Sequence, residues 1–414
     1  MDFTHRAGMR LLHTSDWHIG RMLHTKRRYE EHEAFFSWLI DTIEEYRVDA
    51  LIIAGDVFDS STPSNRSQEL YYRFLRRMSL SACRHVIVIA GNHDSPTFLT
   101  APREILKVLD VHVTGSAEVP EDQVLVLYKG QVPELIVCAV PYLRDREIRM
   151  VEAGESTADK ERKLAEGIQR HYEMVAKIAE QKKKELAADI PIVATGHLYA
   201  AGGETTEGDG VRNLYIGTLL RVGASTFPES IRYLALGHLH SAQKVNNSET
   251  MRYSGSPLPM NFGEDRQKSV TLVEFSGTET AVELIDVPVF KKLERISGSL
   301  EEMTRRLREL AAENSDAWIE ANYEGEEIHA DLRERLEDVI AKTQMEIILV
   351  KNSRKVGHTL SRAYEGEMLF DLKESEVFER LLDTGSYTEK ERAELVETFE
   401  EVLASMHEQM REPE

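Results

Sequence analysis

The strongest constraint on the fold is a set of five short polar motifs, each of which directly follows an apolar, β-rich run. The motifs are Ser15-Asp16-Trp17-His18, Gly55-Asp56-Val57-Phe58-Asp59, Gly91-Asn92-His93-Asp94, Gly196-His197-Leu198 and Gly237-His238-Leu239-His240. Apolar runs of this kind are typical of buried strands. The pattern therefore predicts sheets whose strand ends carry metal-binding side chains, and in open α/β sheets this edge is where sites are built.

Helical patterns separate the first three motifs. Phe35, Leu39 and Ile43 recur at helical spacing, and a second pattern of this kind ends near Met78. The resulting β-α-β-α-β order predicts parallel strands wound with helices. One long helix is predicted over residues 159–188. Between Ile231 and Val287 short turns separate the strands, which predicts antiparallel pairing there.

A second, smaller unit is predicted after Pro288, where strands and helices alternate again as β-α-β-α-β. We therefore predict domains at residues 9–288 and 289–352, a linker at 353–373 and a helical pair at 374–414. The apolar stripe of the helical pair is too small to form a core alone, so we expect it to bind a partner protein. The stripe consists of Val377, Phe378, Leu381, Leu395, Phe399 and Leu403.

The chain is acidic, with a formal net charge of −21 over 414 residues. This balance argues against binding of nucleic acid through a broad basic face. Residues 365–414 contain 16 acidic and 5 basic residues, so this tail alone contributes −11. We expect the tail to be a solvated helical pair or a protein-docking arm.

Several protein classes are disfavoured. No apolar run is long enough to span a membrane, and the polar start, Met1 to Gly8, contains no hydrophobic signal segment. Cys83 and Cys138 lie in apolar runs and are expected to be buried and reduced, as in a cytoplasmic protein. No Gly-x-x-x-x-Gly-Lys-Ser/Thr motif occurs, so we expect no ATP site of that type in this chain.

The motif residues have the chemistry of a two-metal site. Two divalent ions about 3.5–4 Å apart need a bridging carboxylate and can share a hydroxide nucleophile at neutral pH. Asp56 is the predicted bridge because it follows the middle motif strand. We predict the ligands Asp16, His18, Asp56, Asn92, His197, His238 and His240. Mixed imidazole, carboxylate and amide ligation suits Mn²⁺, with Fe²⁺ as the alternative.

His93 and Asp94 are predicted to act beside the metal ligands. We expect His93, oriented by Asp94, to protonate a leaving oxygen or to stabilise the charged transition state. Other residues have structural interpretations. His13 is expected to be structural and residues 182–184 to be a solvated helix end, whereas Trp17 and Arg21 either pack or line a substrate cleft. His85, His112 and His329 are interpreted as ordinary surface or edge residues.

At these motifs the chain resembles the calcineurin-like metallophosphoesterases, whose motif set is Asp-x-His, Gly-Asp, Gly-Asn-His-Asp, Gly-His and Gly-His-x-His. Longer stretches resemble the bacterial nuclease subunits of this superfamily, over essentially the whole chain. These stretches are Leu11 to Gly20, Ala54 to Asp59, Ala194 to Leu198, Tyr215 to Thr218, Ala235 to Gln243 and Tyr253 to Pro257. Where archaeal and eukaryotic relatives have a histidine, this chain has Asp59, so a role of that histidine does not carry over.

The resemblance implies an α/β fold with a two-sheet β-sandwich flanked by helices (four layers), a small β-α-β-α-β cap domain and a C-terminal helical tail. It implies Mn²⁺-dependent hydrolysis of DNA phosphodiesters by a metal-bound hydroxide. The implied activities are a double-strand 3′–5′ exonuclease and a single-strand and hairpin endonuclease, used in DNA repair, recombination and replication. The implied partners are DNA, a second copy of the chain and an SMC-like ATPase subunit bound by the tail, in a heterotetramer.

Two alternative functions remain open on the residues alone. The five motifs would also suit a phosphoesterase for small substrates, such as a cyclic-nucleotide phosphodiesterase. The cap and the docking tail favour the nuclease, because a small-molecule hydrolase needs neither. A scaffold with a decayed site is disfavoured because every expected ligand is present.

Overall fold

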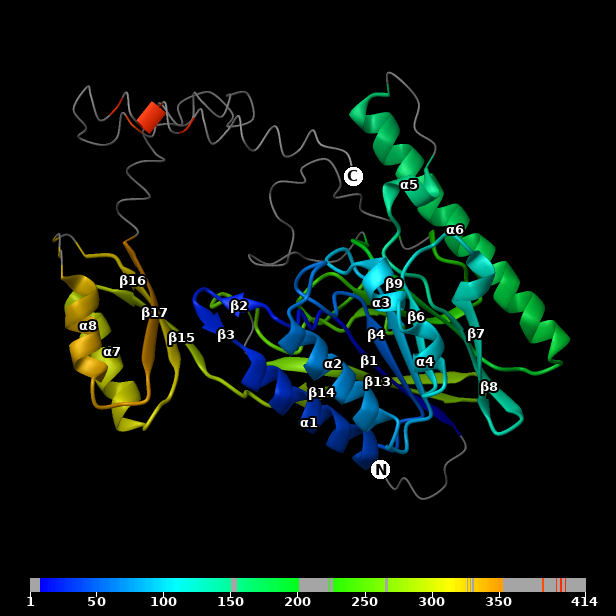
Figure 1. Cartoon of the computed structure of the whole chain (residues 1–414), viewed down its shortest axis with the longest axis horizontal. Helices are drawn as coiled ribbons and strands as arrows, with labels where there is room; N and C mark the ends of the chain where they lie inside the picture. The colour runs from blue at the N-terminus through cyan, green and yellow to red at the C-terminus, as the bar shows by residue number, and fades with distance from the viewer. Residues whose placement is uncertain are drawn as a thin grey trace. The chain divides into compact units, whose positions relative to one another are not determined.

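The structure is a computed structural model and describes residues 8–149, 155–200, 223, 226–264, 267–325, 327, 329, 331–352, 382, 392, 395, 396 and 399. By its internal contacts the chain divides into two compact units, Met1–Leu293 and Glu294–Glu414 (Figure 1). A search of the described helices finds none with the length and apolar character needed to cross a membrane.

The first unit contains two six-stranded sheets, of which sheet 1 has the order β14-β13-β1-β4-β5-β6. Its strands are β1 (Met9–Thr14), β4 (Ala50–Ala54), β5 (His85–Ile89), β6 (Val111–Thr114), β13 (Lys268–Ser276) and β14 (Glu279–Val287). The first four run parallel, and β13 and β14 extend the sheet antiparallel. The predicted β-α-β-α-β order is confirmed. Its two helices are α1 (Tyr29–Glu45) and α2 (Asn65–Met78). The short helices α3 (Pro96–Thr100) and α4 (Arg103–Lys107) connect β5 to β6.

Sheet 2 has the order β11-β12-β10-β9-β8-β7. Its strands are β7 (Val124–Lys129), β8 (Val132–Cys138), β9 (Ile192–His197), β10 (Ile231–Gly237), β11 (Gln243–Lys244) and β12 (Met251–Tyr253). Strand β10 runs parallel to both of its neighbours, β9 and β12, so the predicted antiparallel pairing is wrong there. The segment between β10 and β12, which includes β11, returns the chain so that β12 starts beside Leu234, in the middle of β10.

Short elements and one long helix complete the first unit. They are the ribbon β2 (Met22–Leu23) and β3 (Lys26–Arg27), the 3₁₀ turn η1 (Pro120–Gln123), α5 (Asp145–Ile148) and α6 (Thr157–Glu185). Helix α6 is the long helix predicted from the sequence, and it covers sheet 2, whereas α1 and α2 cover sheet 1 (Figure 1).

Successive side chains of a strand pack on opposite faces of its sheet, and this packing joins two sheets and two sets of helices into four layers. In β1, Leu12 packs with α1 and α2, while its neighbour Leu11 packs in a core shared with Val137 and Val193 of sheet 2. A third core joins the far face of sheet 2 to α6 through residues such as Tyr172. Because successive strand residues face opposite sides, one strand supplies two cores. The helix–sheet–sheet–helix arrangement is the predicted two-sheet sandwich flanked by helices.

Between Leu293 and Asn352 the described part of the second unit contains a three-stranded sheet in the order β15-β16-β17 and the helices α7 and α8. Its elements are β15 (Leu293–Gly298), α7 (Leu300–Ala312), β16 (Trp318–Tyr323), α8 (Leu332–Ile340) and β17 (Glu346–Asn352). A capping box starts α7: Ser299 Oγ accepts a bond from the Glu302 amide, and Glu302 Oε2 accepts one from the Ser299 amide. Met303, Leu307 and Leu336 lie in the core of this unit.

Most of the predicted partner-binding tail lies outside the described residues. This applies to the linker at 353–373 and to Val377, Phe378, Leu381 and Leu403. Leu395 is described, and its side chain is 37% exposed. Phe399 is the other described member of the predicted stripe.

Several structural interpretations from the sequence are confirmed. Trp17 is fully buried, packs edge-on against Phe74 and donates from its indole nitrogen to Thr14 Oγ1 over 3.0 Å, so it packs and lines no cleft. His13 is also fully buried, with Nδ1 2.9 Å from the Tyr233 hydroxyl. Both cysteines are buried and free.

A buried histidine outside the metal centre, His171, predicts that the folded chain loses stability in acid. His171 of α6 lies 2.8 Å from Gln123 Oε1, and burial lowers its pKa from 6.5 to about 4. Between these pH values the unfolded chain binds a proton at this residue and the folded chain does not. Stability is therefore lost as the pH falls through this window, by about 3 kcal/mol from this residue.

A His171→Gln variant, which keeps a side-chain donor for Gln123, should lose about 3 kcal/mol less between pH 7 and pH 4. Urea unfolding of metal-free protein at the two pH values measures this difference. An equal pH dependence in the variant and the parent would show that another group carries the acid sensitivity.

Candidate metal centre

The loops that follow β1 and β4 are joined through their backbones. The amides of Asp16, His18 and Ile19 donate to the carbonyls of Gly55, Asp56 and Val57 over 3.0, 2.9 and 2.9 Å. These bonds hold the first two motifs side by side at the carboxyl ends of adjacent parallel strands. Asp16, His18 and Asp56 are thereby brought together by backbone geometry before any metal is considered.

Four of the predicted ligands have positive backbone φ angles, which is uncommon for non-glycine residues. The φ angles are 53° at Asp16, 46° at His18, 49° at Asp56 and 101° at His238. Strain of this kind concentrates at functional sites, where the surrounding structure holds it.

Motif glycines allow the loops to approach closely. A Cβ at Gly91 would lie 2.1 Å from Asp56 Oδ1, and a Cβ at Gly237 would lie 2.0 Å from the Ala54 carbonyl oxygen. Any side chain at these two positions would therefore force the β4 loop away from its neighbours.

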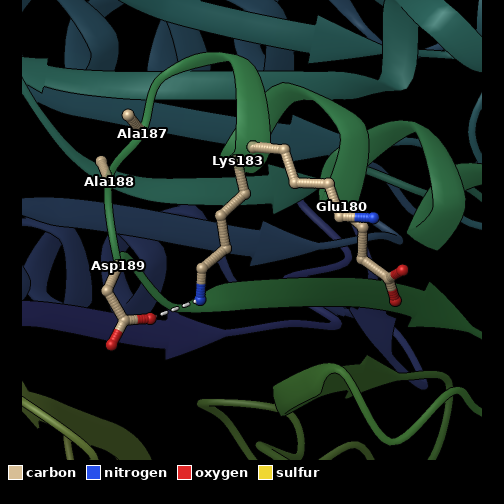
Figure 2. Close-up of a pocket in the computed structure, with 6 residues that line it drawn as sticks. Glu180, Lys183, Ala187, Ala188 and Asp189 are labelled. Carbon is tan, nitrogen blue, oxygen red and sulfur yellow. Dashed lines mark ion pairs between the residues drawn. The ribbon is translucent and has the colours of Figure 1, made fainter.

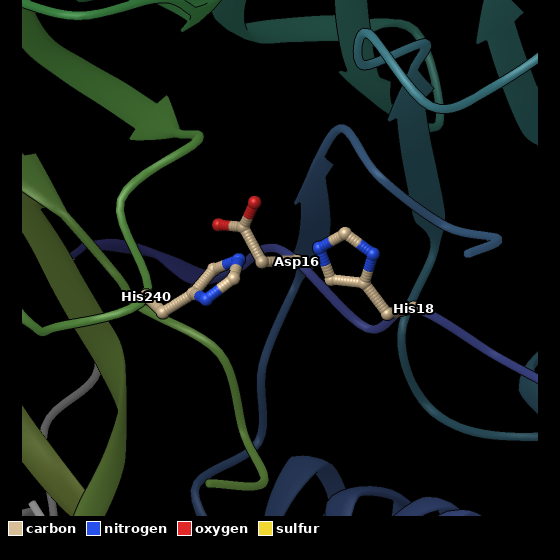
Figure 3. A group of neighbouring side chains, drawn as sticks. All are labelled: Asp16, His18 and His240. Carbon is tan, nitrogen blue, oxygen red and sulfur yellow. The ribbon is translucent and has the colours of Figure 1, made fainter. Parts of the chain in front are cut away.

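Asp16, His18 and His240 form the first group of ligand atoms, which all lie within 4.8 Å of one another (Figure 3). None of the three residues is more than 1% exposed. Both ring nitrogens of His18 are buried and lie beside the carboxylates of Asp56 and Asp59, at 3.5 and 3.3 Å, without a well-aligned hydrogen bond to either. Because buried polar atoms are nearly always satisfied, this imidazole fits the role of a metal ligand.

Asp16, Asp56 and His197 form the second group. The Nδ1 atom of His197 donates to the Ala54 carbonyl over 2.9 Å, so the Nε2 atom faces the site, 3.3 Å from Asp56 Oδ2. Asn92 closes this side of the site, with Oδ1 3.0 Å from His197 Nε2 and 3.1 Å from His238 Nδ1.

Asp56 lies between the two groups. Its Oδ2 atom is 3.5 Å from His18 Nε2 and 3.3 Å from His197 Nε2. Burial alone would raise the pKa of Asp56, but the adjacent charge of His197 holds this pKa well below its usual range. The Asp56 charge in turn raises the pKa of His197 to about 9 against the opposing effect of burial. A carboxylate that stays ionised between two sets of ligands can bridge two ions.

All seven predicted ligands thus converge, and His238 and His240 fall on different sides of Asp56. The donor set of two carboxylates, one amide and four imidazoles fits divalent metal ions. Burial raises the pKa of Asp16 and lowers the pKa of His238 to about 3. A bound cation would compensate the cost of ionising Asp16 in this buried position.

His93 lies beside the first group, with its ring 4.9 Å from the His18 ring. Its amide donates to Asp56 Oδ1, and its Nδ1 donates to the Asp59 carbonyl over 3.0 Å. No hydrogen bond between Asp94 and the His93 ring is found among the described residues. The Asp94 carboxylate instead accepts bonds from the amides of Val57, Phe58 and Gly91 and so holds the loops after β4 and β5 together.

Two carboxylates near the centre have roles that the sequence analysis missed. Asp59 Oδ1 lies 3.3 Å from His18 Nδ1 and 3.2 Å from an Arg21 nitrogen. Glu264 is 6% exposed, with Oε1 3.6 Å from His240 Nδ1 and Oε2 2.7 Å from Lys268 Nζ. Asp59 ends the second motif and could have been found by its spacing. Glu264 follows no predicted strand, so no sequence pattern marked it.

Glu264 is placed to orient the ligand His240. Burial would raise the pKa of Glu264, but its contacts with His240 and Lys268 lower it to about 2, so it is a carboxylate at neutral pH. Loss of such an outer carboxylate costs about 10–100-fold in metal affinity. We expect Glu264→Gln, which can still accept a bond from Lys268, to weaken Mn²⁺ binding by this factor in calorimetric titration.

Glu249→Gln is the matched control, because Glu249 forms an ion pair with Arg252 and lies outside the metal centre. Unchanged affinity in Glu264→Gln, with the fold intact by circular dichroism, would show that His240 needs no support from this carboxylate.

A hollow of about 530 Å³ lies elsewhere, at the end of α6. Figure 2 shows Lys183 reaching across it to Asp189, and the two side chains form an ion pair of 2.7 Å. Lys182 Nζ donates to the Val124 carbonyl. Two of the three consecutive lysines are therefore engaged within the protein, whereas the sequence predicted a solvated helix end.

Comparisons with known proteins agree with this geometry. The calcineurin-like phosphoesterase family matches residues 9–242 of this chain. A second family, described as the Type 5 capsule protein repressor C-terminal domain, matches residues 289–385. The SbcD subunit of nuclease SbcCD from Escherichia coli K12 is 35% identical over 402 residues, which cover 96% of this chain and 98% of that protein. The protein of the same name from Bacillus subtilis is 34% identical over 66% of this chain and 68% of its own.

Proposed function

The chain belongs to the calcineurin-like phosphoesterase family, among the relatives of the SbcD subunit of nuclease SbcCD, and we propose that it is the nuclease subunit of a DNA-processing complex. The proposed reaction is the hydrolysis of DNA phosphodiesters with two Mn²⁺ ions. The proposed activities are a double-strand 3′–5′ exonuclease and a single-strand and hairpin endonuclease, used in DNA repair and recombination.

One observation carries this proposal: six ligand-type side chains from four loops converge around a single ionised carboxylate on a fifth loop, Asp56. We assign Asp16, His18 and His240 to one ion and Asn92, His197 and His238 to the other, with Asp56 between them. When bound, the two ions supply a nucleophile at neutral pH and stabilise the charge that develops on the phosphate.

We assign the proton that leaves with the product to His93. The bond from its Nδ1 to the Asp59 carbonyl fixes the ring, so the doubly protonated imidazolium would donate its Nε2 proton to the leaving oxygen and become the neutral ring that keeps its proton on Nδ1. Asp94 contributes by holding the loops that carry Asp56 and His93. Its role in the reaction is positioning.

The alternative is a phosphoesterase for small substrates, and two assays separate the two functions. The purified chain, with Mn²⁺, is incubated with blunt duplex DNA and, separately, with bis-p-nitrophenyl phosphate. We expect DNA cleavage, with or without added ATPase subunit. Turnover of the small ester without any DNA cleavage, even with the ATPase subunit present, would reject the nuclease.

We also propose that residues 374–414 bind the partner ATPase, SbcC, and that two copies of this chain assemble with it as a heterotetramer. The proposal rests on the apolar stripe, the −11 charge of residues 365–414 and the name of the relatives. We expect deletion of residues 374–414 to abolish co-purification with the ATPase and to leave DNA cleavage by the isolated chain unchanged. Co-purification of the truncated chain would contradict the docking proposal.

A further inference from the structure

A second cluster of ligand-type side chains lies at the opposite end of sheet 1. His85 begins β5, and Asp110 and His112 flank the start of β6. Their ligand atoms all lie within 4.8 Å of one another. The two histidines were interpreted above as ordinary surface or edge residues, but His85 is only 8% exposed, so that interpretation is wrong for it.

The hydrogen bonds of His85 define which ring nitrogen is available. Its Nε2 atom lies 3.0 Å from the Tyr128 carbonyl oxygen, and because a carbonyl only accepts, Nε2 must carry the proton. The Nδ1 atom then carries a lone pair. This atom is buried and has no hydrogen-bond partner among the described residues. A carbonyl bond that fixes the ring and leaves the other nitrogen open is the usual support of a metal-binding histidine.

The other two residues are held in register with His85. Strands β5 and β6 pair so that Ile87 faces His112, and the Val86 amide donates to the Asp110 carbonyl over 3.0 Å. Burial, and then the neighbouring His85, lower the pKa of His112, so its imidazole is neutral at pH 7 and can donate a lone pair. Asp110 is exposed, which gives a cation access from solvent.

Nearby cations do not oppose binding. Arg84 is neutralised by Asp49 and Glu134, at 2.8 and 2.6 Å, and Lys107 pairs with Glu104 at 3.0 Å. The carboxylate of Asp110 would therefore supply the net negative charge of the cluster.

We propose that His85, Asp110 and His112 form a third metal site, for a single borderline transition-metal ion such as Zn²⁺. Two imidazoles and a carboxylate, with a fourth position for water, match a four-coordinate zinc site. Tetrahedral ligands at Zn–N distances of about 2.1 Å lie about 3.4 Å apart, so small side-chain rotations would close the cluster. The ion would join β5 to β6 at the edge of sheet 1, far from the candidate metal centre, and stabilise the folded chain.

The test is the zinc content of the full-length chain and its variants after saturation with Zn²⁺ and removal of free ions. The variants are His112→Ala and Asp110→Asn; asparagine tolerates the left-handed φ of 54° at residue 110. We expect each variant to bind one zinc ion fewer than the parent and to lose one Co²⁺ equivalent in the absorption spectrum. Zinc bound at the candidate metal centre is present equally in the parent and in the variants, so it does not affect the difference in zinc content between them.

Asp122→Asn is the control, because Asp122 is an exposed carboxylate that faces only Arg103, at 3.8 Å, among its described ion pairs. The zinc-dependent rise in melting temperature should disappear in the two variants and persist in the control, and DNA cleavage should be unchanged in all three. Zinc contents equal to that of the parent in both His112→Ala and Asp110→Asn would overturn the proposal.

Discussion

Replacing Asp56 with asparagine should reduce DNA cleavage about 10³-fold, because paired ions supply several kcal/mol of transition-state stabilisation and each 1.4 kcal/mol is tenfold in rate. Asp56 Oδ2 lies within 3.5 Å of a histidine on each side, which is the position that a bridging carboxylate would occupy. An amide keeps the shape of the side chain and its acceptor for the His93 amide, so the fold should persist. Single-turnover cleavage of duplex DNA measures the loss.

Metal content gives this prediction a second readout. Elemental analysis should show that Asp56→Asn retains at most one Mn²⁺ where the parent holds two. Asp41→Asn, an exposed residue on α1, is the control and should match the parent in both measurements. Near-parental cleavage by Asp56→Asn would mean that the centre does not need a bridging carboxylate.

The second large effect is expected at His93. A His93→Ala variant should keep both ions and lose about 10²–10⁴-fold in cleavage, the usual contribution of a positioned proton donor. The His93 ring, which its bond to the Asp59 carbonyl holds in place, lies beside the metal centre. It is not a member of either of the two ligand groups that share Asp16. Cleavage rate and metal content, measured on the same sample, separate a proton donor from a ligand.

The distinction matters because His18, Asp59 and His93 also come close enough to hold an ion. His18→Ala is the matched comparison and should lose metal together with activity. Loss of metal from His93→Ala would assign this histidine to the ligand set and leave the proton donor unidentified.

The candidate ligands could be predicted from the sequence because they lie at or shortly after the carboxyl ends of five strands. The carboxyl ends of parallel strands meet at one edge, so local patterns at Asp16, Asp56 and Asn92 were enough to bring them together. The long helix and the β-α-β-α-β unit after Pro288 followed from hydrophobic periodicity for the same reason, since periodicity is a local property, whereas the layer order was implied by the family resemblance.

Features that depend on distant contacts could not be predicted in this way. The parallel pairing of β10 with β12 depends on the path of residues 238–250, and Glu264 reaches His240 from a segment with no strand-end signal. His85 looks like an edge residue until Tyr128, from another sheet, covers it. Asp94 lies next to His93 in sequence, yet it bonds to backbone amides on two loops.

The division of the ligands between the two sheets has a consequence for how the chain matures. Asp16, Asp56 and Asn92 follow strands of sheet 1, whereas His197, His238 and His240 follow strands of sheet 2. Neither sheet alone holds a full donor set for either ion. A nascent chain that ends before β10 lacks His238 and His240, so we expect it to hold no complete two-metal centre and to become active only after β10 has joined sheet 2.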